Sequence, residues 1–419
     1  MLFFSVASTT TTTTASPTPK QTALWIARTY DSVSPENILV LDRKFNDRAG
    51  EFDSSTYQFI AKTTGYFYLG MSTGIKSAQT VSVSLRGAFP QVTLLRQYTR
   101  PFTTAVKEMI SRDTTAYINQ GEIVNLRSNN QGVSSAFPQS QCALYIYELD
   151  DVAEMSSLFH VSSSVRQSTL GVINFNQIQM SPTSTAFDIG TQSFTCKSTG
   201  TYVFHISSGL VASVGLRLYL KGTARNYALA RESTNHNGVD IISRTVIAQC
   251  NAGSRVTLEL QAGETYSDST DFELSLIGYR YAPKAAADTA FAGYRSMSWQ
   301  GAAGATLAFD TVGRSDNFDG TRFFVSIAGY YYVYYGAIIP QNQYAQLSLV
   351  RTRQSILIEL AAVTSDTTAN NGYDTIGRGV VVQLEAGDTL HIRTQNAVSL
   401  YADPLGYQIS FVGMMLYYN

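Results

Sequence analysis

The sequence predicts an all-β protein made of three tandem antiparallel sandwiches, and three observations support this fold class. Short blocks of sequence recur three times in one order, at intervals of about 130 residues. Apolar and polar residues alternate in short runs, as they do in strands with one buried face. Turn-forming stretches rich in Asn, Ala and Gly separate these runs. Regularly spaced short strands of this kind are typical of a two-sheet sandwich or jelly roll.

The first recurring block joins a phenylalanine, a short polar turn and a glycine that an aromatic strand follows. Phenylalanine precedes glycine by six positions in every copy, at Phe59 and Gly65, Phe194 and Gly200, and Phe323 and Gly329. A second block places a turn glycine between two apolar runs, at Gly121, Gly253 and Gly387. A third block closes each copy with an apolar run, at residues 143–146, 274–278 and 409–413. Three blocks at one period define a domain-sized repeat, longer than the unit of a solenoid.

The repeat divides the chain into domains, and 419 residues also exceed what one hydrophobic core usually supports. We expect an N-terminal Thr/Pro-rich arm at 1–23 and jelly-roll domains at 24–149, 158–282 and 288–419. The arm has the composition of a tether, with a threonine run followed by two prolines. No amphipathic helix of three turns is evident in any copy.

Charge and composition exclude several classes of function. Lys and Arg number 30 against 31 Asp and Glu, so no basic field exists to collect the phosphates of a nucleic acid. No apolar run approaches the length of a membrane span. Residues 1–8 are apolar but short and lack a preceding basic residue, so we identify no clear signal peptide. Three cysteines and the absence of any Asn-x-Ser/Thr acceptor also argue against an ordinary secreted glycoprotein.

The motifs resemble those of the globular head of complement C1q and its tumour-necrosis-factor relatives. The resemblance rests on the aromatic–turn–glycine–aromatic block at 194–204, the Leu-Glu-Ala-Gly-Asp turn at 384–388 and the closing strand at 410–417. Copy three matches best and copy one is most changed. The likeness extends over nearly all of the chain after about residue 24.

This resemblance implies a ten-stranded jelly roll, trimerisation through a flat apolar face and ligand recognition by exposed loops. The chain departs from the family because it has no collagen-like Gly-x-y stalk and has three heads in one polypeptide. We therefore expect the three domains to pack side by side around a pseudo-threefold axis, in place of a three-chain trimer. Short linkers favour this arrangement over domains stacked end to end.

Catalytic and metal-binding motifs are nearly absent. Residues 70–74 fit the nucleophile-elbow pattern, but they lie at the end of a strand where the other copies have no serine. The four histidines are isolated from one another, without metal-ligand spacing. We expect no catalytic residue, no metal ligand and no cofactor. Calcium held by loop carboxylates is the alternative, at pairs such as Asp47 with Glu51 and Asp316 with Asp319.

The cysteines Cys196 and Cys250 fall on apolar strand positions, which suits small buried side chains. By the resemblance their strands are antiparallel neighbours, with each cysteine near the far end of its strand. We expect them to be unbonded, because that placement separates them beyond the roughly 7 Å Cα limit of a disulfide.

Tyrosines on the aromatic strand suggest a binding surface. Tyr202, Phe204 and Ile206 share one parity, which we assign to the core by strand alternation. The opposite parity should face outward, at Tyr66, Tyr68, Tyr330, Tyr332 and Tyr334. These five tyrosines are candidate partner-binding residues, because tyrosine offers a large contact area with a polar tip. Tyrosine is also common in strands for its propensity alone, so both interpretations stay open.

The sequence favours a non-enzymatic, multivalent recognition or assembly protein that binds a glycan or protein partner. The alternative is a structural surface subunit of a virus particle or other large assembly, such as a spike, fibre head or shell component. Either function indicates an extracellular location or a place on the surface of a particle such as a virion. We expect self-assembly into a pseudo-trimer or higher oligomer, and neither nucleic-acid binding nor a membrane span.

Overall fold

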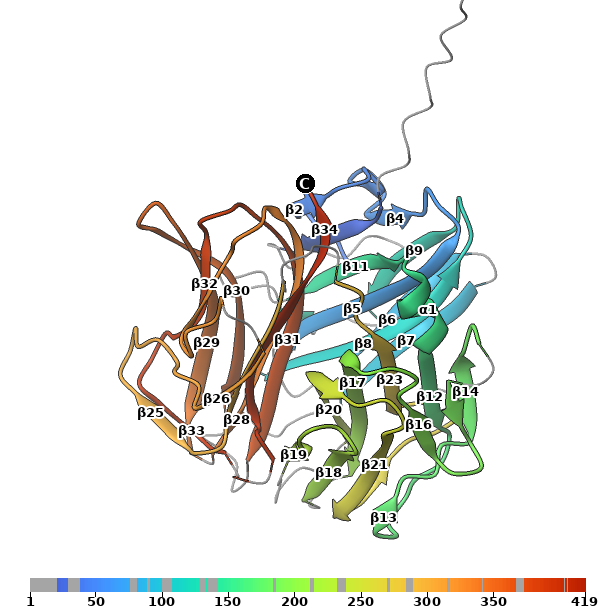
Figure 1. The fold of residues 1–419 in the computed structure, drawn as a ribbon. Helices are drawn as coiled ribbons and strands as arrows, with labels where there is room; N and C mark the ends of the chain where they lie inside the picture. The colour runs from blue at the N-terminus through green and yellow to red at the C-terminus, as the bar shows by residue number, and fades with distance from the viewer. Residues whose placement is uncertain are drawn as a thin grey trace, which may run out of the picture.

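The computed structural model describes residues 21–28, 38–75, 81–88, 91–99, 108–128, 133–134, 142–183, 186–211, 215–231, 239–269, 272–283, 289–314, 317–340, 342–366, 373–402, 404 and 406–419. The described pairings between strands are antiparallel, and they form three successive two-sheet sandwiches. We call the sheet of each sandwich that faces the other two the inner sheet. Figure 1 shows the blue-to-teal, green-to-yellow and orange-to-red sandwiches around a common centre. Most of the predicted arm, residues 1–20, lies outside the described residues.

The first sandwich contains β1 to β11. Its inner sheet has β8 (Glu108–Ile118) and β10 (Val133–Ser134) beside β5 (Gly65–Ile75), followed by β11 (Ala143–Leu149), β1 (Ala23–Ala27) and β2 (Arg43–Asp47). Its outer sheet runs β3 (Phe52–Asp53), β4 (Gln58–Ile60), β9 (Ile123–Ser128), β6 (Val81–Ala88) and β7 (Gln91–Thr99). Helix α1 (Val152–Ser157) leads to the second sandwich, and a capping box between Asp151 and Glu154 starts it.

The second sandwich contains β12 to β23. Its inner sheet runs β14 (Gln177–Met180), β12 (Phe159–Ser163), β23 (Leu274–Arg280), β17 (Gly200–Val211) and β20 (Val239–Cys250), with β22 (Thr265–Tyr266) beside β17. Its outer sheet runs β15 (Phe187–Asp188), β16 (Ser193–Thr195), β21 (Arg255–Ala262), β18 (Leu216–Lys221) and β19 (Tyr227–Arg231), with β13 (Gly171–Val172) beside β21.

The third sandwich contains β24 to β34. Its inner sheet runs β26 (Thr311–Arg314), β24 (Ala290–Arg295), β34 (Ile409–Tyr418), β28 (Gly329–Ile339) and β31 (Asp374–Leu384). Its outer sheet runs β27 (Arg322–Phe324), β32 (Thr389–Thr394), β29 (Tyr344–Arg353) and β30 (Ile356–Asp366), and β25 (Trp299–Gly301) pairs with β33 (Val398–Leu400).

The recurring sequence blocks take the same structural place in each sandwich. Gly65, Gly200 and Gly329 each begin the long inner strand that pairs with β8, β20 and β31 respectively. Gly121, Gly253 and Gly387 all have φ between 83° and 92°, a left-handed conformation that glycine adopts without strain. The Phe-Asp aspartates Asp53, Asp188 and Asp319 all accept main-chain N–H groups two residues further on. Each of these aspartates therefore stabilises a tight turn.

Several strands of the inner sheets, such as β1, β28 and β34, are buried on both faces, which explains their almost continuous apolar sequences. In β1, Leu24 and Ile26 pack into the core of the first sandwich, whereas Trp25 joins the cluster between the sandwiches. In β28, Tyr331 packs on Phe323 inside the third sandwich, and Tyr332 points toward the first. A sheet that has two covered faces requires apolar residues at both parities.

One sequence-based argument is wrong. All three cysteines are buried free thiols, as expected for Cys196 and Cys250. However, the two thiols form a side-chain hydrogen bond with each other, so separation does not keep them apart. The main-chain N–H of Cys196 donates to the carbonyl of Ser254, and that of Gly253 donates to the carbonyl of Cys196. These bonds bring Cys196 against the end of β20, a placement that the resemblance did not specify.

Candidate functional site: the polar centre between the sandwiches

Equivalent residues of the three sandwiches meet at one point. Strands β8, β20 and β31 occupy the same place in the three inner sheets, and each contacts the other two. Ser111, Ser243 and Gly377 are equivalent, because they pair with Ser72, Ser207 and Gly336 on the long inner strands. Ser111 contacts both Ser243 and Gly377, and the three strands contact one another, so the three sandwiches surround an approximate threefold axis.

Three hydroxyl groups satisfy the carbonyls at this axis. Ser243 donates to the carbonyl of Ser111 at 2.7 Å, and Ser111 donates to that of Gly377 at 2.7 Å. The carbonyl of Ser243 accepts from Tyr334 at 3.1 Å. A side chain at residue 377 would overlap the Tyr334 hydroxyl, so glycine at this position makes room for the third donor. The bonds close a ring that includes all three sandwiches.

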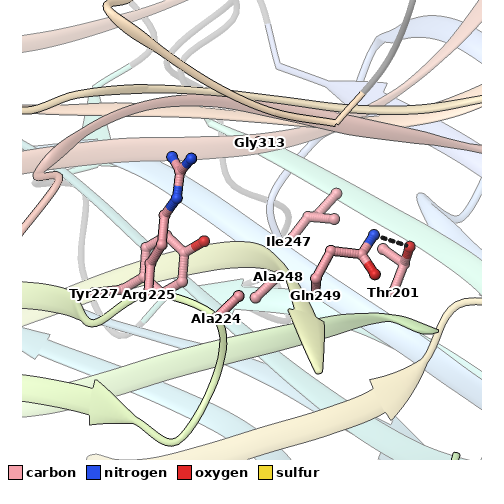
Figure 2. A pocket seen from close by; sticks show the side chains of 8 residues that line it. All are labelled: Thr201, Ala224, Arg225, Tyr227, Ile247, Ala248, Gln249 and Gly313. Carbon is pink, nitrogen blue, oxygen red and sulfur yellow. Dashed lines mark hydrogen bonds between the residues drawn. The ribbon is translucent and has the colours of Figure 1, made fainter. Parts of the chain in front are cut away.

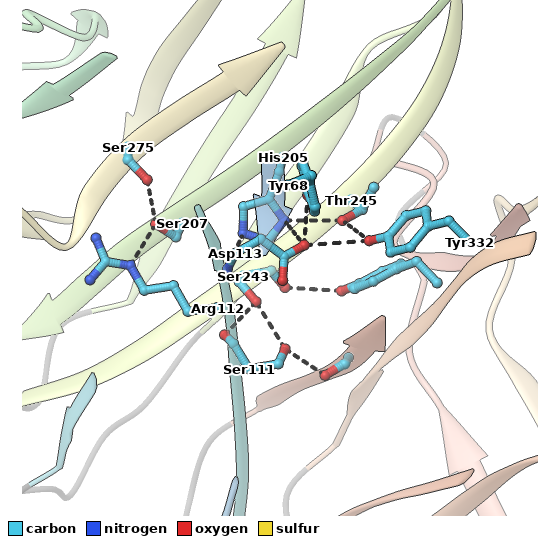
Figure 3. A network of polar contacts seen from close by, with 12 residues as sticks. Tyr68, Ser111, Arg112, Asp113, His205, Ser207, Ser243, Thr245, Ser275 and Tyr332 are labelled. Atoms are coloured by element: carbon cyan, nitrogen blue, oxygen red, sulfur yellow. Dashed lines mark hydrogen bonds and ion pairs between the residues drawn. The ribbon is translucent and has the colours of Figure 1, made fainter. Parts of the chain in front are cut away.

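A single carboxylate, Asp113, lies next to this ring (Figure 3). It accepts hydrogen bonds from Tyr68 at 2.6 Å and from Tyr145, and Tyr332 of the third sandwich lies 3.4 Å away. His205 of the second sandwich places Nδ1 3.1 Å from the same carboxylate. Several donors therefore compensate the cost of burying a charge.

The tautomer of His205 follows from its contacts. Its Nε2 accepts from the main-chain N–H of Asp113 at 3.3 Å, so Nδ1 has the proton and faces the carboxylate and Thr245. Burial lowers the pKa of His205; Asp113 raises it and Arg112 lowers it further. A nucleophilic triad would need the acid and the hydroxyl at opposite nitrogens of the histidine. This geometry therefore serves structure rather than nucleophile activation.

The three copies differ at the axis in a complementary way. The counterparts of Asp113 are Thr245 and Gly379, so the centre holds one carboxylate instead of three that would repel one another. A side chain at Gly70 or Gly379 would overlap the ring of Tyr145. Gly379 of the third sandwich thus makes room for Tyr145 of the first. Such complementarity requires a fixed order of the three copies, which a single chain provides.

Buried arginines join successive sandwiches. Arg112 of the first sandwich donates from Nη2 to the carbonyl of Phe272 in the second. Arg244, its counterpart in the second sandwich, donates from Nη2 to the carbonyl of Tyr407 in the third. Phe272 and Tyr407 are themselves equivalent, and both have positive φ, at 45° and 46°. The same contact therefore recurs at two successive interfaces.

The third arginine of the set is Arg378, which is fully buried and donates to the carbonyl of Ala362 at 3.2 Å. Its pKa is lowered by burial and raised by Tyr335 and by Cys142 of the first sandwich, so it too lies at a junction between sandwiches. The carbonyl that would correspond to Phe272 belongs to residue 140, outside the described residues.

The candidate tyrosines lie mainly between the sandwiches. Tyr68, Tyr332 and Tyr334 are at most 2% exposed and contact groups of neighbouring sandwiches. Tyr330 is 9% exposed and lies under Arg48 of the first sandwich. Tyr66 is half-buried beside Tyr117. The partner that the structure shows for four of these five residues is therefore another part of the same chain.

Other sequence candidates take structural roles. Ser72 of the elbow-like motif lies inside β5 and is buried, away from any strand-to-helix turn. Asp47 accepts the main-chain N–H of Glu51 at 2.7 Å, as a turn-stabilising aspartate does. Asp316 lies outside the described residues. Across the described residues, no group of three His, Cys, Asp or Glu side chains is arranged to hold a metal.

Sequence reasoning missed Arg112, Arg244 and Arg378, although a signal for them exists. The triplets Ile-Ser-Arg at 110–112 and 242–244 and Ile-Gly-Arg at 376–378 recur at the period of the repeat. An arginine at an inward position of an apolar strand in every copy indicates a shared buried contact. Asp113 and His205 had no such signal, because each occurs in one copy only.

Comparison with known proteins identifies the family. The family model of the C1q domain matches residues 158–279 and 286–416. The globular domain of zebrafish complement 1qA matches with 21% identity over 31% of this chain and 99% of its own, at a TM-score of 0.26. Eiger TNF from S. frugiperda matches with 16% identity over 32% and 95%, at 0.28. Murine APRIL matches with 13% identity over 30% and 98%, at 0.26. No curated protein matches the chain.

The fold and the centre define a protein of antiparallel jelly-roll sandwiches packed on one another. The chain belongs to the C1q-domain family, since the family model matches more than half of its residues. The family model confirms the predicted resemblance, and the antiparallel sheets of the structure together with the family model confirm the all-β jelly-roll fold class. Domains of this family typically act outside the cell in recognition or assembly, without catalysis. No helix among the described residues is long and apolar enough to cross a membrane.

Proposed function

We propose that this chain is a non-enzymatic, multivalent recognition protein that contains an entire trimer-like head in one polypeptide. Its domains would be the jelly rolls at 24–149, 158–282 and 288–419, and its partners glycans or proteins outside the cell or on a particle surface. The observation that supports this proposal most is the ring of hydroxyl–carbonyl bonds among residues 111, 243, 334 and 377. The ring uses the inner sheets for contacts within the chain.

The outer sheets and loop ends would then be the surfaces that meet a partner. Exposed apolar side chains occur there, for example Leu170 in the second sandwich and Ile356 and Leu357 at the β29–β30 turn. Three heads in one rigid body would bind a repetitive partner with high effective concentration, and no stalk would be needed to hold them together.

Two measurements test this function. Light scattering coupled to gel filtration should give the mass of one chain, or of a small integer multiple, with a compact radius. Binding of the labelled chain to arrayed glycans and to extracellular proteins should show saturable partners. A chain that binds none of them and polymerises into fibres or shells would contradict recognition and support the structural alternative.

A further inference from the structure

Two of the three cysteines of the chain lie at one place in the second sandwich. Cys196 directly follows β16 of the outer sheet, and Cys250 is the last residue of β20 in the inner sheet. Both belong to one hydrophobic core cluster and are 0% and 1% exposed, whereas Cys142 belongs to the core of the first sandwich. The pair therefore lies between the two sheets of a single sandwich.

A tight turn brings Cys196 to the end of β20. The main-chain N–H of Ser254 donates to the carbonyl of Asn251 at 3.0 Å, so the chain folds back directly after Cys250. The first and last Cα atoms of such a turn lie within about 7 Å of each other. Cys196 donates to the carbonyl of Ser254 at 2.9 Å and accepts from Gly253 at 2.8 Å. The turn thus shortens the path that would separate the two cysteines along extended strands.

Strand alternation directs Cys250 toward Cys196. The preceding residue, Gln249, lines a small opening together with Gly313 of the third sandwich and donates to Thr201 at 3.0 Å (Figure 2). Successive side chains of a strand point to opposite faces, so Cys250 points away from the third sandwich and into the core of the second. The two thiols accordingly form a hydrogen bond with each other.

The other two sandwiches have the same main-chain arrangement without thiols. The equivalent residues are Ala61 and Ile118 in the first sandwich and Val325 and Leu384 in the third. Ala61 and Val325 donate to the turn at 3.0 and 2.8 Å, as Cys196 does, and all four residues are buried. The fold therefore requires sulfur at neither position. The second sandwich has it at both, in mutual contact, which points to a reaction of the pair rather than to packing alone.

We propose that Cys196 and Cys250 form a redox modification site, at which a small-molecule disulfide converts the two thiols into an intrachain disulfide bond. One thiolate attacks the reagent and releases its first thiol, and the other then attacks the mixed disulfide and releases the second. Two protein thiols and one reagent disulfide thus give one protein disulfide and two reagent thiols. The new bond links the outer sheet of the second sandwich to its inner sheet. This site goes beyond the proposed recognition function and does not depend on it.

The reaction should be slow in the folded protein. The hydrogen bond with Cys196 and burial raise the pKa of Cys250, so the reactive thiolate is rare there. We therefore expect the bond to form mainly while the chain folds, when a reagent can reach both thiols. Domains of this family typically act outside the cell, where disulfides form and persist.

Refolding in the presence of oxidised glutathione tests the site. The full-length Cys142→Ala variant, which retains only the two thiols of the pair, should lose the mass of two hydrogen atoms when it refolds from urea. Trypsin should then release peptide 167–197 linked to peptide 245–255. The wild type should give the same linked pair, with peptide 128–166 and its Cys142 left unlinked, so the test does not depend on the folding of the variant.

The bond should also stabilise the chain, because it closes a loop of 54 positions (250−196) that is otherwise open in the unfolded state. The midpoint of thermal unfolding should rise by about 5 °C or more over that of the reduced chain. Dithiothreitol should reverse this rise. The matched control is Cys196→Val with Cys250→Leu, which has the residues of the third sandwich. Its midpoint should be the same with oxidised glutathione as with dithiothreitol.

Three results would overturn the assignment. The first is two free thiols, or two glutathione adducts, in the refolded Cys142→Ala variant or in the wild type. The second is a linkage of Cys196 or Cys250 to Cys142 or to another chain in place of the proposed bond. The third is a bridged chain whose unfolding midpoint is no higher than that of the reduced chain.

Discussion

The guanidinium of Arg244 in the second sandwich donates a hydrogen bond to the main-chain carbonyl of Tyr407 in the third sandwich. The same guanidinium also reaches the carbonyls of Ala228 and Gly406, the latter at 3.1 Å. Since the residue is 3% exposed, these carbonyls replace water for a buried charge. The contact joins two sandwiches through the main chain, which makes the interface sensitive to this one side chain.

Arg244→Met should therefore lower the free energy of unfolding by about 3–5 kcal/mol, because it leaves buried carbonyls without donors. Arg322→Met, at an exposed position of the third sandwich, should change it by no more than about 0.5 kcal/mol. Urea unfolding followed by tyrosine fluorescence or circular dichroism measures both. Equal stability of the two variants would mean that Arg244 does not hold the interface.

Asp113 is the second sensitive residue. Asp113→Ala should cost about 3–5 kcal/mol, since Tyr68 and Tyr145 would retain buried hydroxyls without an acceptor. Asp113→Asn keeps the shape and one acceptor oxygen, so its loss should be smaller. The order of unfolding midpoints, wild type above Asn above Ala, is the expected result. An Ala variant as stable as wild type would show that the network contributes nothing.

Gly377 and Tyr334 should be coupled. Gly377→Ala introduces a methyl group that overlaps the Tyr334 hydroxyl, at an expected cost of roughly 1–3 kcal/mol. Tyr334→Phe removes that hydroxyl and its bond to Ser243, so the double variant should lose less than the sum of the two single losses. A double-mutant cycle from chemical unfolding gives this coupling. Strict additivity would argue that the two residues are not in contact.

The buried side chain of His160 should make the protein less stable in mild acid. Burial, with smaller contributions from Arg112 and His205, lowers the pKa of His160 from 6.5 to about 3. Below pH 6.5 the unfolded chain binds a proton at this residue that the folded chain rejects. Stability should therefore fall as pH decreases from about 6.5 toward 3, by up to about 1.4 kcal/mol per pH unit for this residue.

The matched variant isolates this effect. Glu273 works in the opposite direction, because burial raises its pKa to about 7 and the folded chain then binds the extra proton between about pH 4.5 and 7. Comparing His160→Gln with wild type at pH 7, 6 and 5 cancels that contribution. The variant should show a shallower decline on acidification, and parallel curves would contradict the neutral state of His160.

The sequence predicted the strand architecture well because the signals for it are local and repeated. Gly121, Gly253 and Gly387 mark turns that need positive φ, and the Phe-Asp pairs mark turns that an aspartate stabilises. The outward parity of Tyr68 and Tyr332 was also readable. The sequence did not indicate which groups pack against these tyrosines, since that depends on how whole sandwiches dock.

Contacts between residues that occur in only one copy could not be predicted from the sequence. Asp113 and His205 belong to different sandwiches and have no counterpart of their own type, so no pattern relates them. Arg112, Arg244 and Arg378 could have been predicted from the sequence, because their triplet recurs with the repeat.

An engineered cross-link tests most directly that one chain folds its three sandwiches around a common axis. Ser111 and Ser243 lie in the first and second sandwiches, with their hydroxyl oxygens 3.1 Å apart. In the double variant Ser111→Cys with Ser243→Cys, mild oxidation should form a disulfide between these residues within one chain. Mass spectrometry of the unreduced, digested monomer should recover the linked peptides. Finding the bond only between two chains, or not at all while each single variant folds normally, would contradict the account.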